Sequence, residues 1–181
     1  MAIYSNYPQI KKETVSIKGE RMNNTCIYSD MLIKGDTIRV YNIHLASNWF
    51  NSSDYSFMQN PQQEKLKEGI LGITKRMRTS YKKRAEEVDV IKEHMLSSPY
   101  PLIVCGDFND TPLSYAYHSI KGNLVDAFSQ SGKGIGSSFV KIPALRIDYI
   151  LHDAEFKSTN YQKYNQILSD HYAVSCEITT P

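Results

Sequence analysis

Cysteine is scarce in this sequence, and no two cysteines are close enough along the chain to form a CxxC motif. The 181 residues contain three of them, Cys26, Cys105 and Cys176. An odd number of widely separated cysteines argues against a disulfide framework. We therefore predict three reduced and mostly buried thiols, which favours a reducing compartment such as the cytoplasm.

Long apolar runs are also missing. No stretch of about 18 apolar residues occurs, and no segment has the apolar core of a signal peptide, so the sequence predicts a soluble chain. Neither sign of charge dominates, because 21 lysines and arginines face 19 aspartates and glutamates. The resulting net charge of +2 permits a nucleic-acid partner without requiring one.

A nucleotide-binding P-loop is absent as well. Gly132, Gly134 and Gly136 form a glycine-rich segment, but it lacks the Gly-Lys-Ser/Thr ending that such a loop needs. What is present is typical of one globular domain spanning residues 1–181: 41% hydrophobic and 22% charged residues, with no repeats or low-complexity tracts. The length suffices for a substantial core.

Residues 104–111, Val-Cys-Gly-Asp-Phe-Asn-Asp-Thr, combine a strand with polar side chains at its end. The apolar run 102–105, between a proline and a glycine, predicts a buried strand. In an extended backbone Asp107 and Asn109 would point to the same side and Phe108 into the core. An ordinary turn with N-cap residues is an equally good interpretation of this stretch taken alone.

Three further stretches place polar side chains beside apolar strands. Residues 146–151, Arg-Ile-Asp-Tyr-Ile-Leu, form an apolar run with one acid. Residues 169–172, Ser-Asp-His-Tyr, put an acid beside a histidine just before the apolar run 173–178. Residues 42–45, Asn-Ile-His-Leu, bring His44 to the end of a strand. A single histidine in a strand is more often structural than functional. Each stretch alone is therefore weak evidence for a functional site, and the argument depends on their occurring together.

The ordered motifs GDFN, RIDYIL and SDHY resemble the carboxyl-terminal half of the endonuclease/exonuclease/phosphatase superfamily, the deoxyribonuclease I-like hydrolases, and NIHL resembles that family's Asn-x-His-Leu motif. The resemblance implies an α/β (α+β) fold, a four-layer α/β/β/α sandwich of two mainly antiparallel sheets. It also implies divalent-metal-dependent hydrolysis of a phosphoester bond, as a nuclease, phosphodiesterase or phosphatase. Nucleic acid, phospholipid and small phosphate esters all stay open as substrates.

The resemblance implies roles for the acids and the histidine of the later motifs. Asp170 is the expected ligand of Mg²⁺ or Mn²⁺, since a hard cation prefers carboxylate oxygen. His171 is expected to act as general base or as a phosphate partner. The carboxylate that orients it would be Asp148 or an acid from an N-terminal part of the family domain.

The earlier motifs would act on the phosphoryl group itself. By the resemblance, Asp107 and Asn109 orient the nucleophile and bind a phosphoryl oxygen. His44 would stabilise or protonate the leaving group. Arg146 and Tyr149 are expected to give structural support.

The resemblance covers nearly the whole chain but only the later two thirds of the family domain, so we expect a domain truncated at its N-terminus. Residues 2–5 would be the end of a strand. The family's metal-binding glutamate has no counterpart, because Glu13 and Glu20 lie in a polar, lysine-rich segment typical of solvated surface. Uncovered strands favour self-association. Loss of a metal ligand usually lowers metal affinity or activity strongly. The alternative function is therefore a non-catalytic module that binds phosphate or a partner.

The rest of the chain predicts a hairpin, a loop and a long helix. Residues 25–33 and 37–45 would be strands joined by the turn 34–36. Residues 46–60 form a polar and aromatic loop that is either pinned to its own domain or placed over the site to select a substrate. From Pro61 onward, an apolar stripe predicts a helix that faces the core: Leu66, Ile70, Ile73, Met77, Tyr81, Ala85, Val88, Ile91 and Met95.

A basic segment lies in the middle of this predicted helix. Residues 75–84 contain six cations and no acid: Lys75, Arg76, Arg78, Lys82, Lys83 and Arg84. A solvated helix face is the simpler interpretation. Contact with a polyanion, either nucleic acid or an anionic membrane, is the alternative, and the segment does not distinguish between these two partners.

Overall fold

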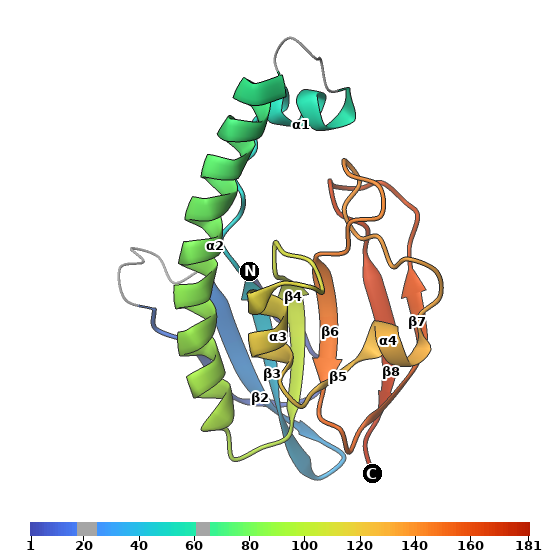
Figure 1. Ribbon diagram of the computed structural model, residues 1–181. Coiled ribbons are helices and arrows are strands. Elements are labelled where there is room, and N and C mark those ends of the chain that lie inside the picture. The colour runs from blue at the N-terminus through green and yellow to red at the C-terminus, as the bar shows by residue number, and fades with distance from the viewer. Residues whose placement is uncertain (18–24, 61–65) are drawn as a thin grey trace.

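The computed structural model describes residues 1–17, 25–60 and 66–181, which form a mixed α/β fold with two sheets (Figure 1). The larger sheet has the strand order β1-β2-β3-β4-β6-β5, and the smaller one pairs β7 with β8. The strands are β1 (Gln9–Thr14), β2 (Cys26–Ile33), β3 (Asp36–His44), β4 (Leu102–Asp107), β5 (Val125–Asp126), β6 (Asp148–His152), β7 (Lys157–Lys163) and β8 (Val174–Thr179). The helices are α1 (Ser52–Gln59), α2 (Leu66–Leu96), α3 (Tyr115–Lys121) and α4 (Ala127–Ser131). This architecture agrees with the predicted fold class.

Three adjacent strands of the large sheet bring polar residues to one end. The predicted hairpin of β2 and β3 is confirmed, and it turns at Lys34 and Gly35, whose φ angles of 53° and 101° suit a tight hairpin. β3 and β4 run parallel, whereas β4 and β6 run antiparallel. These registers set His44 opposite Asp107 and Asp107 opposite Asp148. Strand pairing alone therefore gathers three of the predicted site residues.

Helix α2 covers the sheet with only its second half (Figure 1). Val88, Ile91 and Met95 are buried and belong to the core cluster that also contains side chains of β3, β4 and β6. Near the other end, Ile70 and Leu71 are 50% and 68% exposed, because this half of the helix projects beyond the sheet. The prediction that the whole apolar stripe faces the core was wrong for the first half of the helix.

The six cations of residues 75–84 do not share one face. With 3.6 residues per turn, cations so closely spaced along the chain are distributed around the helix. Arg84 is 1% exposed and pairs with Asp110, and Arg76 pairs with Asp54 of α1. The exposed cationic surface is therefore smaller than the sequence suggests.

The N-terminal part differs from the prediction. Residues 2–5 form no regular strand, and the first strand is β1, within the segment interpreted as solvated surface. β1 is an edge strand whose side chains are largely exposed, so it shows no alternation of apolar and polar residues. Glu13 lies on β1 and is exposed as expected, and it accepts a hydrogen bond of 2.6 Å from the hydroxyl of Tyr28. Glu20 and Pro61 lie outside the described residues.

The predicted loop 46–60 contains helix α1. A capping box starts this helix: the Asn51 side chain accepts a hydrogen bond from the Asp54 backbone, and the Asp54 side chain accepts one from the Asn51 backbone, each at 2.9 Å. The sequence carries this signal as Asn-x-x-Asp. It was missed because the aromatic residues of the segment show no helical periodicity.

The three cysteines are unpaired, as predicted. Only Cys26 is buried, and its burial raises the pKa of the thiol to about 12, whereas Cys105 and Cys176 are half-buried. Within the three described ranges, no helix combines the length and the apolarity needed to cross a membrane.

Candidate active site

The turn after β4 holds Asp107 and Asn109 side by side. Gly106 has a φ of 146°, and a Cβ at this position would overlap the carbonyl oxygen of Ile43, so only glycine fits. The chain then adopts a left-handed conformation at Asn109, with φ of 51°, which asparagine tolerates. The backbone and side-chain amides of Asn109 donate to the two carboxylate oxygens of Asp107, at 2.8 and 3.0 Å. Phe108 between them is fully buried.

His171 faces this turn from the loop that precedes β8. Its Nδ1 lies 2.8 Å from Oδ2 of Asp148, one of the two orienting acids that the resemblance left open. Its Nε2 lies 3.9 Å from Oδ2 of Asp107, and Nε2 of His44 lies 3.7 Å from the same oxygen. Asp107 is therefore the residue on which both histidines converge, and Asp148 holds one of them.

The loop before β6 fixes the relative position of Asp148 and His171. The buried hydroxyl of Ser138 accepts hydrogen bonds from the backbone amides of Ile147 and Asp148, at 3.0 and 3.1 Å. The next residue, Phe139, forms an isolated β-bridge with His171, and the centroids of their rings are 5.2 Å apart. One short segment thus contacts both members of the acid–histidine pair.

The site concentrates negative charge in a partly buried place. Burial raises the pKa of Asp107, and the nearby charge of Asp148 raises it further. The hydrogen bond with Asp148 raises the pKa of His171 above its ordinary value, while burial opposes that change. A positive charge near these acids, from a protonated histidine or from a cation, would offset the burial of Asp107 and its repulsion by Asp148.

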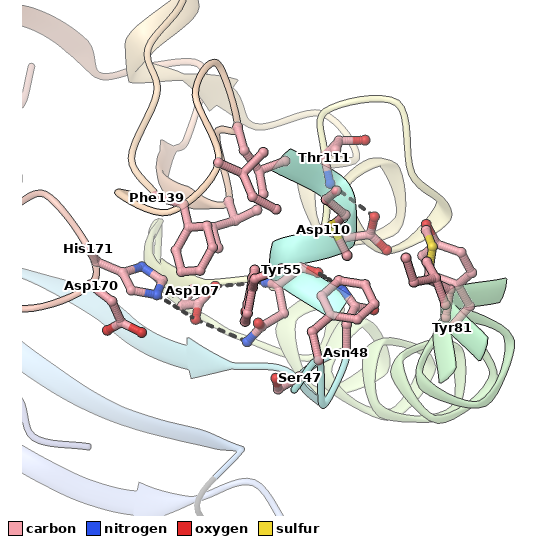
Figure 2. Close-up of a pocket in the computed structure, with 18 of the residues that line it drawn as sticks. Ser47, Asn48, Tyr55, Tyr81, Asp107, Asp110, Thr111, Phe139, Asp170 and His171 are labelled. Carbon is pink, nitrogen blue, oxygen red and sulfur yellow. Dashed lines mark hydrogen bonds and ion pairs between the residues drawn. The ribbon is translucent and has the colours of Figure 1, made fainter. Parts of the chain in front are cut away.

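Among the residues that the structure describes, Asp107, Asp148 and His171 are the one group whose potential ligand atoms all lie within 4.8 Å of one another. Their two carboxylates suit a hard cation such as Mg²⁺. Asp170, the ligand expected from the sequence, is outside this group. Its side chain is 53% exposed, and Oδ2 lies 3.4 Å from Nζ of Lys141. It lines the same cavity as His171 (Figure 2).

A cavity of about 530 Å³ joins the polar site to an apolar wall. Figure 2 shows Asp107, Asp170 and His171 at one end and Tyr81 at the other. The polar residues at the cavity are His44, Ser47, Asn48, Asp107, Asn109, Asp110, Thr111, Asp170 and His171. The apolar and aromatic ones are Phe50, Tyr55, Met58, Ile73, Met77, Tyr81, Phe139, Ile142, Leu145 and Ile147. Part of the predicted loop 46–60 therefore does face the site.

Arg84 supports the site, although the sequence showed it only as one member of a cationic run. Its Nε lies 3.1 Å from Oδ2 of Asp110. Its terminal nitrogens donate to the carbonyl of Ala46 at 2.7 Å and to the side chain of Asn48 at 3.1 Å. One buried guanidinium thus ties α2 to the segments that follow β3 and β4, both of which carry site residues.

Arg146 and Tyr149 contact the framework around the site. Nη1 of Arg146 donates to both carboxylate oxygens of Asp126, at 2.8 and 3.1 Å. The hydroxyl of Tyr149 donates to the carbonyl of Asp110 at 2.8 Å. Neither residue lines the cavity, and these contacts match the supporting role expected for both.

Replacing Arg84 by methionine is expected to lower the free energy of unfolding by about 3 to 5 kcal/mol. Methionine retains the packing of the stem but leaves the carboxylate of Asp110 buried without its ion partner. Urea denaturation followed by circular dichroism measures the change, and Lys82→Met on the exposed surface of the same helix is the control, expected within about 0.5 kcal/mol of the unchanged protein. Equal losses in the two variants would contradict this account of Arg84.

The comparisons with known proteins bear on this geometry. The sequence matches the model of the Endonuclease/Exonuclease/phosphatase family over residues 1–171. No curated protein matches it. A mannosyl-6-phosphatase from Bacteroides thetaiotaomicron has a similar structure, with 16% identity and a TM-score of 0.63 over 96% of this chain and 67% of that one. The human Nocturnin catalytic domain, solved with a sulfate anion, has 16% identity and a TM-score of 0.62, over 96% and 60% of the two chains.

A functionally unknown protein from Enterococcus faecalis is also similar, with 14% identity and a TM-score of 0.67, over 96% of this chain and 67% of that one. Identities this low show the fold and not the substrate. The chain spans only 60 to 67% of the length of these three structures. Because the family model matches nearly the whole sequence, from the first residue through His171, the chain belongs to the endonuclease/exonuclease/phosphatase family.

Proposed function

We propose that this chain hydrolyses a phosphoester bond with the help of a divalent cation. The observation that carries the proposal is the convergence of His44, Asp107 and the Asp148–His171 pair at one end of the large sheet. Membership in the family supports phosphoester hydrolysis in general. The use of a metal and the activity of this chain by itself belong to the proposal.

His171 is the proposed general base. Because Nδ1 lies 2.8 Å from a carboxylate oxygen of Asp148, we assign the hydrogen to Nδ1, which leaves a lone pair on Nε2. Nε2 would take a proton from the attacking water, and Asp148 would stabilise the imidazolium that forms. The raised pKa of His171 reflects the same stabilisation.

Asn109 is proposed to hold Asp107 in place. Its side-chain amide donates to Oδ2 of Asp107 and to the carbonyl of Leu45, both at 3.0 Å, so its two amide hydrogens are engaged. This gives Asn109 a positioning role instead of the expected direct contact with a phosphoryl oxygen. His44 approaches the same carboxylate oxygen from β3 and is proposed to protonate the leaving group.

The donor set fits a hard divalent cation. The charge of Asp148 raises the pKa of Asp107, and a cation held by these two carboxylates would offset that repulsion. Asp170 is proposed as a further oxygen ligand because it lies at the same cavity. When bound, Mg²⁺ or Mn²⁺ would take up charge from the phosphoryl oxygens.

Hydrolysis of bis(p-nitrophenyl) phosphate tests the proposal. We expect Mg²⁺-dependent release of nitrophenolate that EDTA abolishes, and a loss of at least about tenfold in Asp107→Asn. Binding of Mn²⁺, followed by electron paramagnetic resonance, gives a readout without turnover and should also weaken in this variant. Asp36→Asn, at the exposed first residue of β3, is the matched control. Hydrolysis that persists in EDTA would rule out the metal-dependent mechanism.

A second candidate function is phosphate binding without catalysis. The candidate metal-binding group among the described residues contains no glutamate, and loss of one metal ligand lowers affinity or rate by orders of magnitude. A chain that binds Mn²⁺ and inorganic phosphate but releases no nitrophenolate would support this second function. Self-association and a polyanion contact through residues 75–84 stay predictions from the sequence.

A further inference from the structure

The cavity continues from the polar site onto the projecting half of α2. Ile73, Met77 and Tyr81 are four residues apart, so they lie on one face of the helix, and all three line the cavity. They precede Val88, the point from which the apolar stripe reaches the core. This part of the stripe is thus presented to the cavity instead of to the sheet.

Contacts between α1 and α2 hold this wall in place. Nε of Arg76 lies 3.0 Å from Oδ2 of Asp54, which is 9% exposed. The ring of Phe57 lies so close to Gly69 that a Cβ at Gly69 would overlap it. The two helices are therefore packed together, and these contacts fix the position of the apolar wall relative to the rest of the fold.

Four side chains of the wall offer apolar contact only. Met58, Met77, Ile142 and Leu145 come from α1, α2 and the loop before β6, and none of them carries a strong donor or acceptor. Ser47, Asn48, Asp110 and Thr111 line the same cavity, and the side chains of Asn48 and Asp110 already pair with Arg84. A sugar placed against the four apolar side chains would lose its hydrogen bonds to water without replacing them. Methionine side chains adapt to flexible apolar groups. The lining thus favours an alkyl group.

We infer that the substrate of this site is a phosphoester with an alkyl group, which lies on the apolar wall while the phosphoryl group lies at Asp107 and His171. The inference rests on the proposed function, since it names the substrate class for that same site. Continuity of one cavity from the acids to Met77 is the observation that carries it. The cavity of about 530 Å³ is within the range of small-molecule sites.

Binding of two phosphonates tests the inference without any turnover. Hexylphosphonate and methylphosphonate carry the same anionic group, but their carbon–phosphorus bond is not a phosphoester. Isothermal titration calorimetry in the presence of Mg²⁺ should show hexylphosphonate binding at least about tenfold more tightly, because its longer chain buries more apolar surface. A ratio of affinities close to one, or no detectable binding of hexylphosphonate, would overturn the inference.

Three variants of α2 locate the effect. Met77→Ser is expected to lower the ratio of the two affinities at least about threefold, because it removes apolar contact from the wall. Met77→Leu keeps an apolar side chain of similar size and should retain the preference. Leu96→Ser, at the 79% exposed last residue of α2, makes the same kind of change away from the cavity and should also retain it. An unchanged ratio in Met77→Ser would place the alkyl group elsewhere and overturn the inference.

The two proposals fail in different ways. A preference for hexylphosphonate without hydrolysis of any phosphodiester would leave the alkyl site standing and contradict the catalytic proposal. Hydrolysis of bis(p-nitrophenyl) phosphate without a preference for hexylphosphonate would support the catalytic proposal and contradict the alkyl site.

Discussion

Replacing His171 by alanine is expected to lower the turnover of bis(p-nitrophenyl) phosphate at least about a hundredfold. The imidazole is the proposed proton acceptor, and its Nδ1 contact of 2.8 Å with Asp148 shows that the ring is already oriented for this role. The side chain of His171 is 27% exposed, and its removal takes little from the core. We therefore expect the rate to fall while the thermal unfolding temperature stays within a few degrees, measured by steady-state kinetics and by circular dichroism.

His118→Ala is the control for this experiment. His118 is exposed on α3 and does not line the cavity, so its removal should leave turnover unchanged. Turnover close to that of the unchanged protein in His171→Ala would refute the assignment of the general base. A large loss of thermal stability in His171→Ala would show instead that the ring has a structural role.

Replacing Gly106 by alanine is expected to lower the free energy of unfolding by about 3 to 5 kcal/mol. The φ of 146° is one that L-residues rarely adopt, and the added Cβ would overlap the backbone of Ile43 on the neighbouring strand. Backbone atoms of a central strand cannot move aside without breaking the pairing of β3 with β4. Urea denaturation of the purified variant measures the effect.

Gly72→Ala is the matched comparison for Gly106→Ala. Gly72 lies in α2, and no atom lies within 4 Å of the position that its Cβ would take. Alanine is the better helix former, so this variant should gain about 0.5 to 1 kcal/mol. Equal effects of the two substitutions would contradict the explanation by close backbone contact at Gly106.

Much of the local structure was predictable from the sequence because neighbouring residues determine it. The β2–β3 hairpin follows from two β-rich runs around Lys34 and Gly35, and β4 follows from its apolar run before Gly106. β1 was missed because it is a polar edge strand. Helix α1 was missed because a capping box was its main signal.

The candidate site was predictable in its members and less so in its arrangement. The motifs named His44, Asp107, Asn109, Asp148 and His171, all of which the structure brings together. The position of Asp170 beside Lys141, the engagement of both amide hydrogens of Asn109 and the burial of Arg84 were not predictable. Each depends on a partner distant in sequence or on an exact turn geometry.

The order of the motifs and the apolar runs identify the candidate site residues and the strands that present them, because both are local properties of the chain. How far α2 reaches the core, which of its cations are buried and what its outer apolar face contacts depend on segments distant in the sequence. A period of three to four residues shows that a helix has an apolar face, but it does not show what lies opposite that face. In this protein the first half of that face lies opposite the cavity beside Asp107 and His171.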